Sequence, residues 1–229
     1  MTAIVTGAAR GIGRAVAERL IAERPVVLAD LDPAVTDVAS DLGGVGVVAD
    51  VTSADGRAAI LAAADGDISV LVNNAGITKD ARIVKMTEEQ FLAVIRVNLG
   101  AAYALTTAAV PRFAEGASVV SLASRAYLGN FGQFNYSASK GGLVGMTRAL
   151  ALQLAPKVRV NAIAPSLTAS EMTSAMPEKV LDKMIASIPL GRMAQPREIA
   201  ETIATLASPA MAYVTGQVVV ACGGRSLAP

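Results

Sequence analysis

The chain has 229 residues and a formal net charge of +1, with 53% hydrophobic and 17% charged residues. This length suits one α/β domain, which buries enough surface to fold without a disulfide or a structural metal. The near-neutral charge and the lack of a basic block are not typical of nucleic-acid-binding proteins. The sequence has no histidine, and its single cysteine is Cys222. These counts exclude an internal disulfide, a cysteine metal cage, and catalysis by Ser-His or Cys-His pairs, and no metal site is expected.

Two features of the composition bear on location and assembly. The most apolar stretch, Val97–Val110, contains Asn98, Thr106 and Thr107 and is shorter than a bilayer requires, so no membrane span is expected. The first residues, TAIVTG, show no charged leader or apolar signal region, which predicts a cytoplasmic protein. The high apolar content is interpreted as a subunit interface, so we expect a homo-oligomer.

Short β-branched runs alternate with Ala-rich helical stretches along the whole chain. Most runs are continuously apolar, which is typical of strands covered on both faces. The expected strands are Ala3–Thr6, Val26–Ala29, Val45–Ala49, Val70–Val72, Ser118–Leu122, Arg159–Ile163 and Val218–Val220. The expected helices are Ile12–Glu23, Pro33–Leu42, Ala54–Ala64, Glu88–Phe113, Tyr136–Leu154 and Arg197–Ala207. This alternation predicts a single α/β domain over residues 1–229, with one doubly wound parallel sheet, helices on both faces and right-handed crossovers.

One segment, Ala164–Gln195, breaks this pattern. It contains Pro165, Pro177 and Pro189 and shows no clear period. A long irregular connection inside a compact domain more often has a function than fills space. We therefore expect a substrate loop or lid over about 164–195.

A glycine-rich turn follows the first expected strand. In "VTGAARGIGRAVAERL", Gly7, Gly11 and Gly13 permit a tight turn and a close backbone approach, and the helix begins near Ile12. A helix N-terminus offers free N–H groups and a positive dipole end to a phosphate. The turn is therefore interpreted as a dinucleotide phosphate site, although a purely structural turn is the alternative. Its spacing is G-x-x-x-G-x-G rather than G-x-G-x-x-G.

Acidic residues after the next two strands refine this interpretation. Asp30 ends the second strand about 20 residues beyond the turn, where a carboxylate accepts hydrogen bonds from ribose hydroxyls and repels a 2′-phosphate. It favours NAD(H). Arg10 favours NADP(H) instead, because its side chain can pair with a 2′-phosphate. NADP(H) is therefore the alternative cofactor. Asp32 is interpreted as a helix-start residue. Asp50, with Val51, either borders the adenine or is a loop or helix-start residue.

The stretch "NYSASKGGLVG" places Tyr136 and Lys140 one helical turn apart, on the same face. A free phenol has a pKa near 10, and a neighbouring ammonium group favours the phenolate and lowers that pKa. A phenol with a pKa closer to neutral pH acts as a general acid in reduction and as a general base in oxidation. The alternative is an exposed tyrosine beside a snorkelling lysine.

Several motifs now occur together in a known order and spacing. They are "TGAARGIG" (Thr6–Gly13), "NNAG" (Asn73–Gly76), the asparagine of "VNLG" (Asn98), a serine upstream of the tyrosine, and "YSASK" (Tyr136–Lys140). Over essentially its whole length the chain resembles the short-chain dehydrogenase/reductase (SDR) family. The stretches "NNAGITKDARIVKMTEEQF" and "IPLGRMAQPREIA" are most similar to the branch of 3-oxoacyl-[acyl-carrier-protein] reductases and acetoacetyl-CoA reductases. The resemblance implies a Rossmann fold and a homotetramer.

The resemblance also implies catalytic roles. Ser124 lies 12 residues before Tyr136, one residue closer than is usual in the family, and its hydroxyl is expected to bind the substrate carbonyl and stabilise the developing alkoxide. Ser121 is the alternative. Lys140 is implied to hold the nicotinamide ribose as well as to tune the tyrosine. Asn98 is implied to interrupt its helix and to anchor a water that relays protons; the alternative is a side chain bonded back to its own helix.

The "NNAG" segment follows the fourth expected strand. Its small residues Ala75 and Gly76 allow the backbone to approach the cofactor. Asn73 either binds a ribose or braces the sheet, and the sequence does not separate these roles.

The segment "NAIAPSLTASEMT" follows the sixth expected strand. By resemblance, Pro165, Thr168 and Ser170 meet the carboxamide and pyrophosphate of the cofactor. The chain departs from the family pattern at Ser166, where a glycine is usual. Cys222 also replaces a usual residue and is interpreted as a buried small hydrophobe.

Together these features predict an NAD(P)(H)-dependent oxidoreductase, with NAD(H) favoured. It would interconvert a ketone and a secondary alcohol by hydride transfer between the nicotinamide and the carbonyl carbon. By resemblance the substrate is a 3-oxoacyl thioester or a related β-keto compound. The alternatives are an SDR dehydrogenase of a cyclic alcohol or dihydrodiol, and a non-catalytic dinucleotide-binding sensor.

Overall fold

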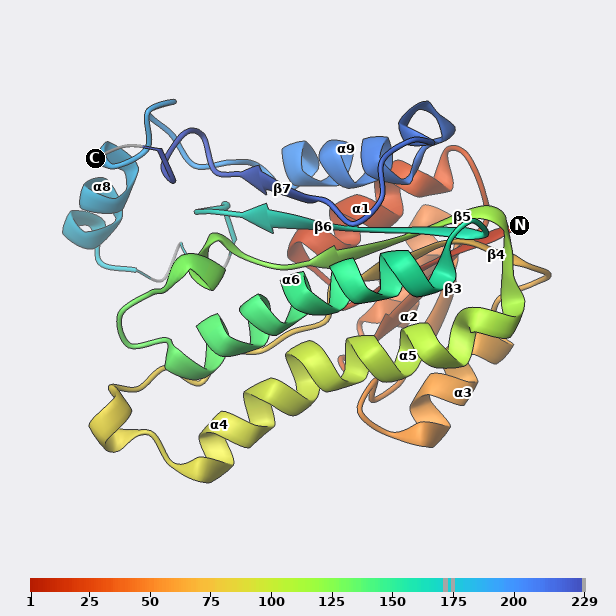
Figure 1. Ribbon diagram of the computed structural model, residues 1–229, viewed down its shortest axis with the longest axis horizontal. Coiled ribbons are helices and arrows are strands. Elements are labelled where there is room, and N and C mark those ends of the chain that lie inside the picture. Colours follow the sequence, from red (N-terminus) through yellow and green to blue (C-terminus); the bar gives the residue numbers. More distant parts are fainter. Residues whose placement is uncertain (171–172, 174–175, 228–229) are drawn as a thin grey trace.

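The computed structural model describes residues 1–170, 173 and 176–227. Within these residues the chain forms one parallel sheet of seven strands in the order β3-β2-β1-β4-β5-β6-β7 (Figure 1). The strands are β1 (Thr2–Thr6), β2 (Val26–Asp30), β3 (Val45–Val48), β4 (Ile68–Asn73), β5 (Phe113–Leu122), β6 (Val158–Pro165) and β7 (Val218–Ala221). The predicted fold class, a doubly wound parallel sheet covered by helices, is confirmed.

Helices cover both faces of the sheet, and each face has its own apolar core. The described α-helices, whether or not they cover a face, are α1 (Gly11–Ile21), α2 (Val35–Leu42), α3 (Ala54–Ala62), α4 (Glu88–Ile95), α5 (Ala101–Ala109), α6 (Phe134–Leu154), α8 (Glu178–Ala186) and α9 (Pro196–Ala207). Helices α1, α2 and α9 pack on one face, and α3, α5 and α6 pack on the other (Figure 1). Strands β1 and β6 are buried at every position. Most of their residues are apolar, as expected for strands covered on both faces, and the buried Arg159 and Asn161 of β6 donate to backbone carbonyls.

The predicted single helix Glu88–Phe113 is wrong in detail. Helix α4 passes into a π-helical turn, η2 (Arg96–Gly100), before α5 begins, and Phe113 already belongs to β5. Single π-helical turns inside α-helices are often found at functional sites. Of the described helices, only this continuous stretch from Glu88 to Arg112 is long and apolar enough to cross a membrane. It packs along the sheet and α6 (Figure 1), and core helices of soluble proteins pass the same test.

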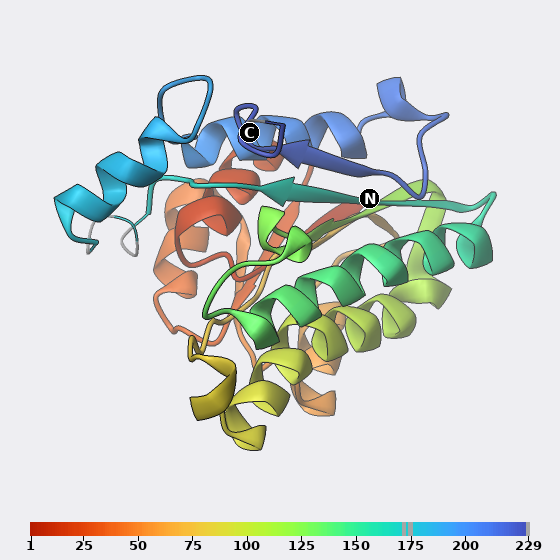
Figure 2. The ribbon, with the colours of Figure 1, turned by 60° about the vertical axis from the view of Figure 1, so that its left-hand side comes forward.

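The segment predicted to be irregular, 164–195, is partly ordered as a helix. Strand β6 runs through Pro165, a bridge pairs Thr168 with Ala194, and α8 occupies the middle of the segment. Residues 171, 172, 174 and 175 lie outside the described residues. Figures 1 and 2 show α8 beyond the carboxyl ends of the strands. The segment therefore projects past the edge of the sheet at which ligands bind in this architecture.

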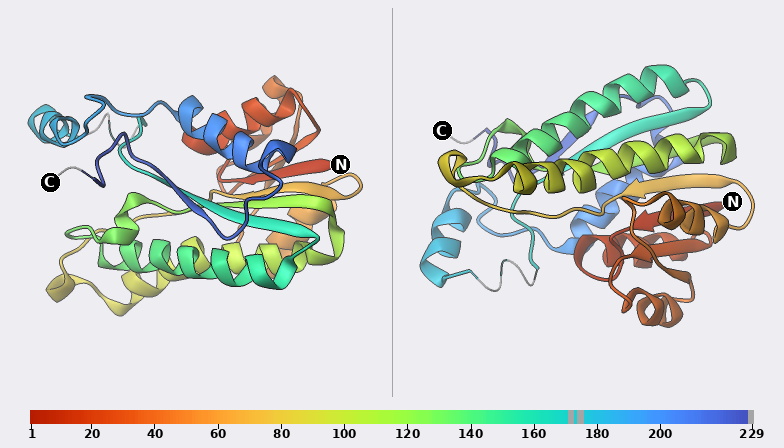
Figure 3. Two further views of the ribbon diagram at one scale, coloured as in Figure 1. Left: turned by 45° about the horizontal axis from the view of Figure 1, so that its top comes forward. Right: turned by 90° about the horizontal axis from the view of Figure 1, so that it is seen from below.

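The strand order fixes where that edge is open. The chain order of the strands reverses between β1 and β4, which is the topological switch point of the sheet. The loops that follow these strands, and those after β5 and β6, leave the same end of the sheet (Figure 3). In open parallel sheets a ligand binds in the crevice at this point.

The central strand β4 supplies a test of the core. Leu71 is fully buried, and replacing it with alanine removes apolar contacts and leaves a cavity. We expect Leu71→Ala to lower the free energy of unfolding by about 2–5 kcal/mol in urea denaturation. The matched control is Leu227→Ala, because Leu227 is 90% exposed. A loss of less than about 0.5 kcal/mol for Leu71→Ala would contradict this packing.

Candidate active site

The glycine turn after β1 is closely packed against the start of α1. Gly7 and Gly11 have φ angles of 66° and 57°, in the left-handed region that favours glycine. A Cβ atom on Gly13 would lie 2.0 Å from the carbonyl oxygen of Gly7, so no other residue fits there. Arg10 is the N-cap residue of α1, and no side chain caps this helix start. The uncapped amides at Gly11, Ile12 and Gly13 suit a phosphate.

The "NNAG" loop after β4 is tied to this turn by hydrogen bonds. The hydroxyl oxygen of Thr6 accepts from the backbone N–H groups of Asn74 and Ala75, both at 3.1 Å. The side-chain amide of Asn74 donates to the carbonyl oxygens of Thr6 and Gly7, both at 2.9 Å. Neither Thr6 nor Asn74 was predicted to be a positioning residue. The polar Thr6 at the end of an apolar strand was the available signal.

Asp30 lies where the sequence predicted it, at the end of β2 beside the turn. Its carboxylate accepts from the backbone N–H groups of Ala9 (2.9 Å) and Asp32 (3.1 Å). Arg10, the possible partner of a 2′-phosphate, donates to the Asp32 carboxylate at 3.0 Å. Asp32 also accepts from the N–H of Ala34, just before α2, in agreement with its interpretation as a helix-start residue. This pairing leaves Arg10 less available to a phosphate.

For Asp50 and Asn73 the structure favours one of the two alternatives. Hydrogen bonds from the side chain and backbone of Thr52 hold the pKa of the Asp50 carboxyl below its usual range and fit the role of a turn residue, while a contact of Asp50 with the adenine stays a prediction. Val51 is buried beside it. The amide of Asn73 donates to the hydroxyl of Thr106 on α5 at 2.9 Å, and both side chains are buried. Asn73 therefore braces the sheet against α5.

Lys140 is buried beside Tyr136 on α6. It is 3% exposed, its ammonium nitrogen donates to the carbonyl oxygen of Leu122 at 2.6 Å, and it lies 5.5 Å from the centroid of the Tyr136 ring. Leu122 ends β5, so the contact joins α6 to the sheet. Burial lowers the pKa of Lys140 to about 8.

The expectation that the pKa of the Tyr136 phenol lies below its ordinary value is wrong for the protein alone. Burial raises the pKa of the Tyr136 phenol above its ordinary value; a hydrogen bond with Ser124 acts in the opposite direction, and the charge of Asp80 adds to the rise. The cost of desolvating a phenolate therefore exceeds the effects of its neighbours. The phenol stays protonated at neutral pH.

Ser124 rather than Ser121 faces the tyrosine. Ser124 follows β5, caps the short helix η4 (Arg125–Leu128) by accepting from the N–H of Ala126 at 3.2 Å, and hydrogen-bonds Tyr136. Ser121 is fully buried within β5, and its hydroxyl has no partner among the described residues. The shorter spacing between Ser124 and Tyr136 therefore still brings the two hydroxyls together.

Asn98 lies in the π-helical turn and is fully buried. Its side-chain oxygen accepts from the N–H of Ile77 (2.8 Å), and its amide donates to the carbonyl of Ile77 (3.0 Å) and to the hydroxyl of Ser139 (3.1 Å). The prediction that Asn98 interrupts its helix is confirmed. The alternative, a bond back to its own helix, is wrong. Ser139, one residue before Lys140, was missed by the sequence analysis.

Gly76 allows this group to converge. A Cβ atom there would lie 3.2 Å from the Asn98 side-chain oxygen and 3.6 Å from the Lys140 nitrogen. The loop after β4, the π-helical turn and α6 thus meet at one glycine. The convergence places Asn98 and Lys140 at the open end of the sheet, behind Tyr136.

The loop after β6 is held in place by local hydrogen bonds. Pro165 is the last residue of β6, and the N–H of Ser166 donates to the carbonyl of Ala221 at 3.1 Å. Thr168 donates to the Ser166 carbonyl at 3.2 Å, and the N–H of Ser170 donates to the hydroxyl of Thr173 at 2.9 Å. These contacts give the loop a defined path past the site.

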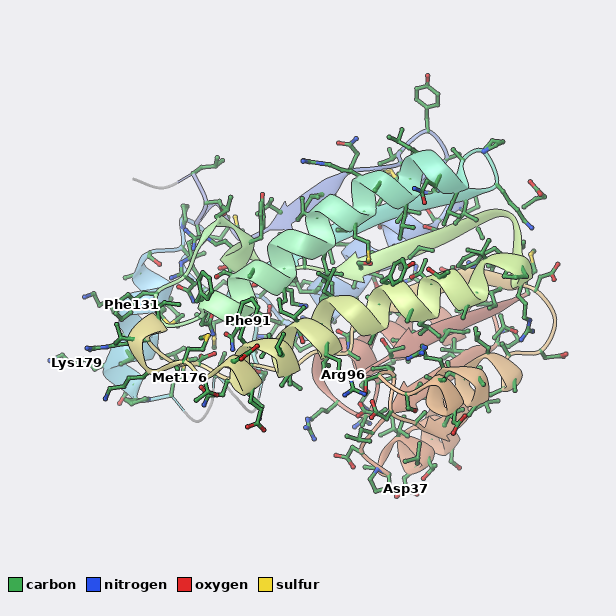
Figure 4. The ribbon with its side chains drawn as sticks, turned by 60° about the horizontal axis from the view of Figure 1, so that its bottom comes forward. Asp37, Phe91, Arg96, Phe131, Met176 and Lys179 are labelled. Carbon is green, nitrogen blue, oxygen red and sulfur yellow. The ribbon has the colours of Figure 1, made fainter. Side chains whose placement is uncertain are left out.

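Aromatic and apolar side chains gather at the end of the molecule that carries α4 and α8, the candidate entrance to the site (Figure 4). Phe91 on α4 stacks on Phe134 at the start of α6, with ring centroids 5.7 Å apart. The guanidinium of Arg82 lies 5.9 Å from the ring of Phe131, which is 86% exposed. Figure 4 shows Phe131, Met176 and Lys179 at the same end of the molecule as Phe91. The entrance is therefore apolar, with cations beside it.

The residues of the site fit a nicotinamide dinucleotide. The glycine turn offers uncapped amides, and Asp30 lies beside it. Ser124, Tyr136 and Lys140 lie together beyond the end of β5. Within the described residues, no group of three or more acidic or cysteine side chains is placed to hold a metal ion.

Comparison with known proteins agrees with this geometry. Residues 7–226 match a family model described as "Enoyl-(Acyl carrier protein) reductase". The chain is 44% identical to an uncharacterized oxidoreductase of Mycobacterium tuberculosis (98% of this chain, 96% of the relative). It is 41% identical to the 3-oxoacyl-[acyl-carrier-protein] reductase FabG of Thermotoga maritima (96% of each chain).

A solved structure is also similar. It is a crystal structure titled a short-chain dehydrogenase/reductase, glucose/ribitol dehydrogenase, from Brucella melitensis. It has a TM-score of 0.92 and 38% identity over 98% of this chain and 96% of that one. Members of this family bind NAD(P)(H). With the parallel sheet, the glycine turn and the Ser-Tyr-Lys group, these matches make the chain an oxidoreductase of the short-chain dehydrogenase/reductase family.

Proposed function

We propose that the protein reduces a 3-oxoacyl thioester, or a related β-keto compound, to the secondary alcohol with NAD(H) as the favoured cofactor. One observation carries this proposal: Ser124, Tyr136 and the buried Lys140 meet at the carboxyl end of β5, beside the glycine turn. The relative from Thermotoga maritima, named a 3-oxoacyl-[acyl-carrier-protein] reductase, supports the substrate class.

The side chains of the site have separate tasks in this reaction. The bound nicotinamide supplies or accepts the hydride. Tyr136 is protonated at neutral pH, since a phenol has a pKa near 10 and burial raises that pKa further, so its hydroxyl has a proton to donate to the carbonyl oxygen as that oxygen becomes an alkoxide. The Ser124 hydroxyl hydrogen-bonds the same oxygen and stabilises its developing charge.

Lys140 and Asn98 support the tyrosine from behind. In its charged form Lys140 places a buried cation 5.5 Å from the phenol ring and favours its ionised form during proton exchange. Asn98 hydrogen-bonds Ser139 on α6 and Ile77 in the loop after β4. These bonds hold the two segments that lie on either side of Lys140. A proton relay through Asn98 and a bond from Lys140 to the ribose remain predictions.

The cofactor is assigned to the crevice between the loops after β1, β2 and β4. The uncapped amides of α1 would hold the pyrophosphate, and Asp30 would accept hydrogen bonds from the adenosine ribose. Val51, Ala75 and Gly76 would border the cofactor along its length, and Pro165, Thr168 and Ser170 would line the nicotinamide end. Asp30 and the engagement of Arg10 with Asp32 support NAD(H) over NADP(H).

A dehydrogenase of a cyclic alcohol or dihydrodiol is the second candidate, because the apolar entrance also suits such substrates. The intact catalytic group argues against a sensor without catalysis. We also propose a cytoplasmic homotetramer. Exposed apolar side chains along α4 to α6, namely Leu92, Tyr103 and Leu152, support self-association.

Tyr136→Phe tests the proton-transfer role. The variant keeps the ring but has no proton to exchange, so we expect kcat for reduction of acetoacetyl thioesters to fall at least about 10²-fold. The Kd for NADH, measured by calorimetry, should change little. The matched control is Tyr213→Phe, because Tyr213 is fully exposed. Turnover of Tyr136→Phe at the wild-type rate would sink the assignment.

Asp30→Asn tests the cofactor preference. Removing the charge relieves repulsion of a 2′-phosphate, so the ratio of kcat/KM for NADH to that for NADPH should fall by about tenfold. Asp37→Asn, on α2 at the edge of the molecule in Figure 4, loses the same charge and should leave the ratio unchanged. A wild-type enzyme that strongly prefers NADPH would contradict the NAD(H) proposal.

The lowered pKa of Lys140 makes stability depend on pH. Between about pH 8 and pH 10.4 the unfolded chain binds a proton that the folded chain has lost, so the free energy of unfolding rises with pH through this window. Lys140→Met removes this contribution. In urea denaturation from pH 7.5 to 9.5, wild type should gain stability relative to Lys140→Met as the pH rises. Parallel stability curves for the two proteins would show that the pKa of Lys140 is not lowered.

A further inference from the structure

The ends of β5, β6 and β7 lie side by side and bring three segments together. The N–H of Ala123, just after β5, donates to the carbonyl of Ile163 in β6 at 2.8 Å. The N–H of Ser166, just after β6, donates to the carbonyl of Ala221 in β7 at 3.1 Å. Figures 2 and 3 show the short helix after β5 and the loop after β7 at the same end of the sheet.

Two arginines enter this region from different strands. Arg125 directly follows the catalytic Ser124 and begins η4. Helix η4 packs toward β7, because Tyr127 lies in one apolar cluster with Val218 and Val220. Arg225 lies just beyond β7, and its guanidinium donates to the hydroxyl of Ser166 at 3.5 Å.

Neither guanidinium has an acidic partner within the residues that the structure describes. The Nε of Arg125 is buried and has no hydrogen-bond partner in that part of the chain. The two cations also act on each other. Burial lowers the pKa of Arg225, and the charge of Arg125 lowers it further.

The positive charge of Arg125 also acts on Cys222, which directly follows β7. Burial raises the pKa of the Cys222 thiol, but hydrogen bonds from Ser226 and Gly224 and the charge of Arg125 outweigh this, so the pKa is lowered. Partly buried like charges without a counter-ion destabilise a fold, and an anion would remove this cost.

We propose that Arg125 and Arg225 together bind an anionic group, a carboxylate or a phosphate, on the substrate whose carbonyl meets Ser124 and Tyr136. The inference rests on the proposed function and narrows its substrate to one that carries an anion. Guanidinium forks match the two oxygens of a carboxylate or phosphate. Within the described residues the Arg125 guanidinium makes no hydrogen bond and Arg225 makes only a long one to Ser166, so both keep donors available for such a group.

Two substrate pairs separate the sources of the anion. Acetoacetate and ethyl acetoacetate differ by a carboxylate charge. The 3-oxobutanoyl thioesters of phosphopantetheine and of N-acetylcysteamine differ by a phosphate. We expect kcat/KM of the wild-type protein with NADH to be at least about tenfold higher for the charged member of one pair. That pair identifies the anion.

Variants then locate the selectivity. Arg125→Gln and Arg225→Gln should each lower kcat/KM for the charged substrate about tenfold more than for its neutral counterpart. Arg148→Gln, at an exposed position on α6, makes the same charge change and should lower neither. Equal losses on charged and neutral substrates would assign the arginines a structural role and overturn the proposal.

The wild-type protein alone also decides the question. If it turns over the neutral substrates and prefers no charged one, the anion site is wrong while the proposed function stands. If it reduces none of the four, the proposed function fails. The anion site is then judged by thermal melting with saturating NAD, in which malonate should raise the Tm of wild type more than that of Arg125→Gln, and neutral malonamide should raise neither. Equal Tm shifts with malonate would overturn the proposal.

Discussion

The contact between the ammonium of Lys140 and the carbonyl of Leu122 is the interaction on which the site depends. It is short and buried, and among the described residues no carboxylate forms an ion pair with Lys140. A cation in this position loses most of its hydration, which is why its pKa falls toward neutrality. The contact links α6 to the end of β5, so the helix that carries the tyrosine and the strand end that carries the serine are held together. The fold thus accepts a poorly solvated charge beside the tyrosine that we propose as the proton donor.

Close backbone packing is the second constraint on the site. The start of α1 leaves no room for a side chain at Gly13, and Asn74 clamps the same turn from the neighbouring strand end. Farther along the edge, Gly76 lets Asn98 and Lys140 converge. These close approaches fix the distance between the crevice after β1 and β4 and the group formed by Asn98, Lys140 and Tyr136.

Most of the fold could be predicted from sequence, because buried parallel strands are continuously apolar and glycine turns mark their ends. The serine, tyrosine and lysine that we propose as catalytic could also be found, since their spacing is distinctive. The interruption at Arg96–Gly100 was implied only by the family resemblance. The local pattern predicted an unbroken helix, because these residues suit a helix and the tertiary contacts of Asn98 accompany the π-helical turn. Helix α8 was missed because prolines flank it. The direction of the tyrosine's pKa depends on burial by distant segments, which no local pattern reveals.

The π-helical turn between α4 and α5 has a consequence for how this protein tolerates length changes. A π turn holds about one more residue than an α turn, and one residue rotates a helix by about 100°. Deleting one of the residues Leu99 and Gly100 would remove the extra residue of the turn and rotate Asn98 and all of α4 relative to α5. The extra residue therefore sets the rotation of α4 relative to α5. Because of it, α4 packs against α6 while α5 packs against the sheet.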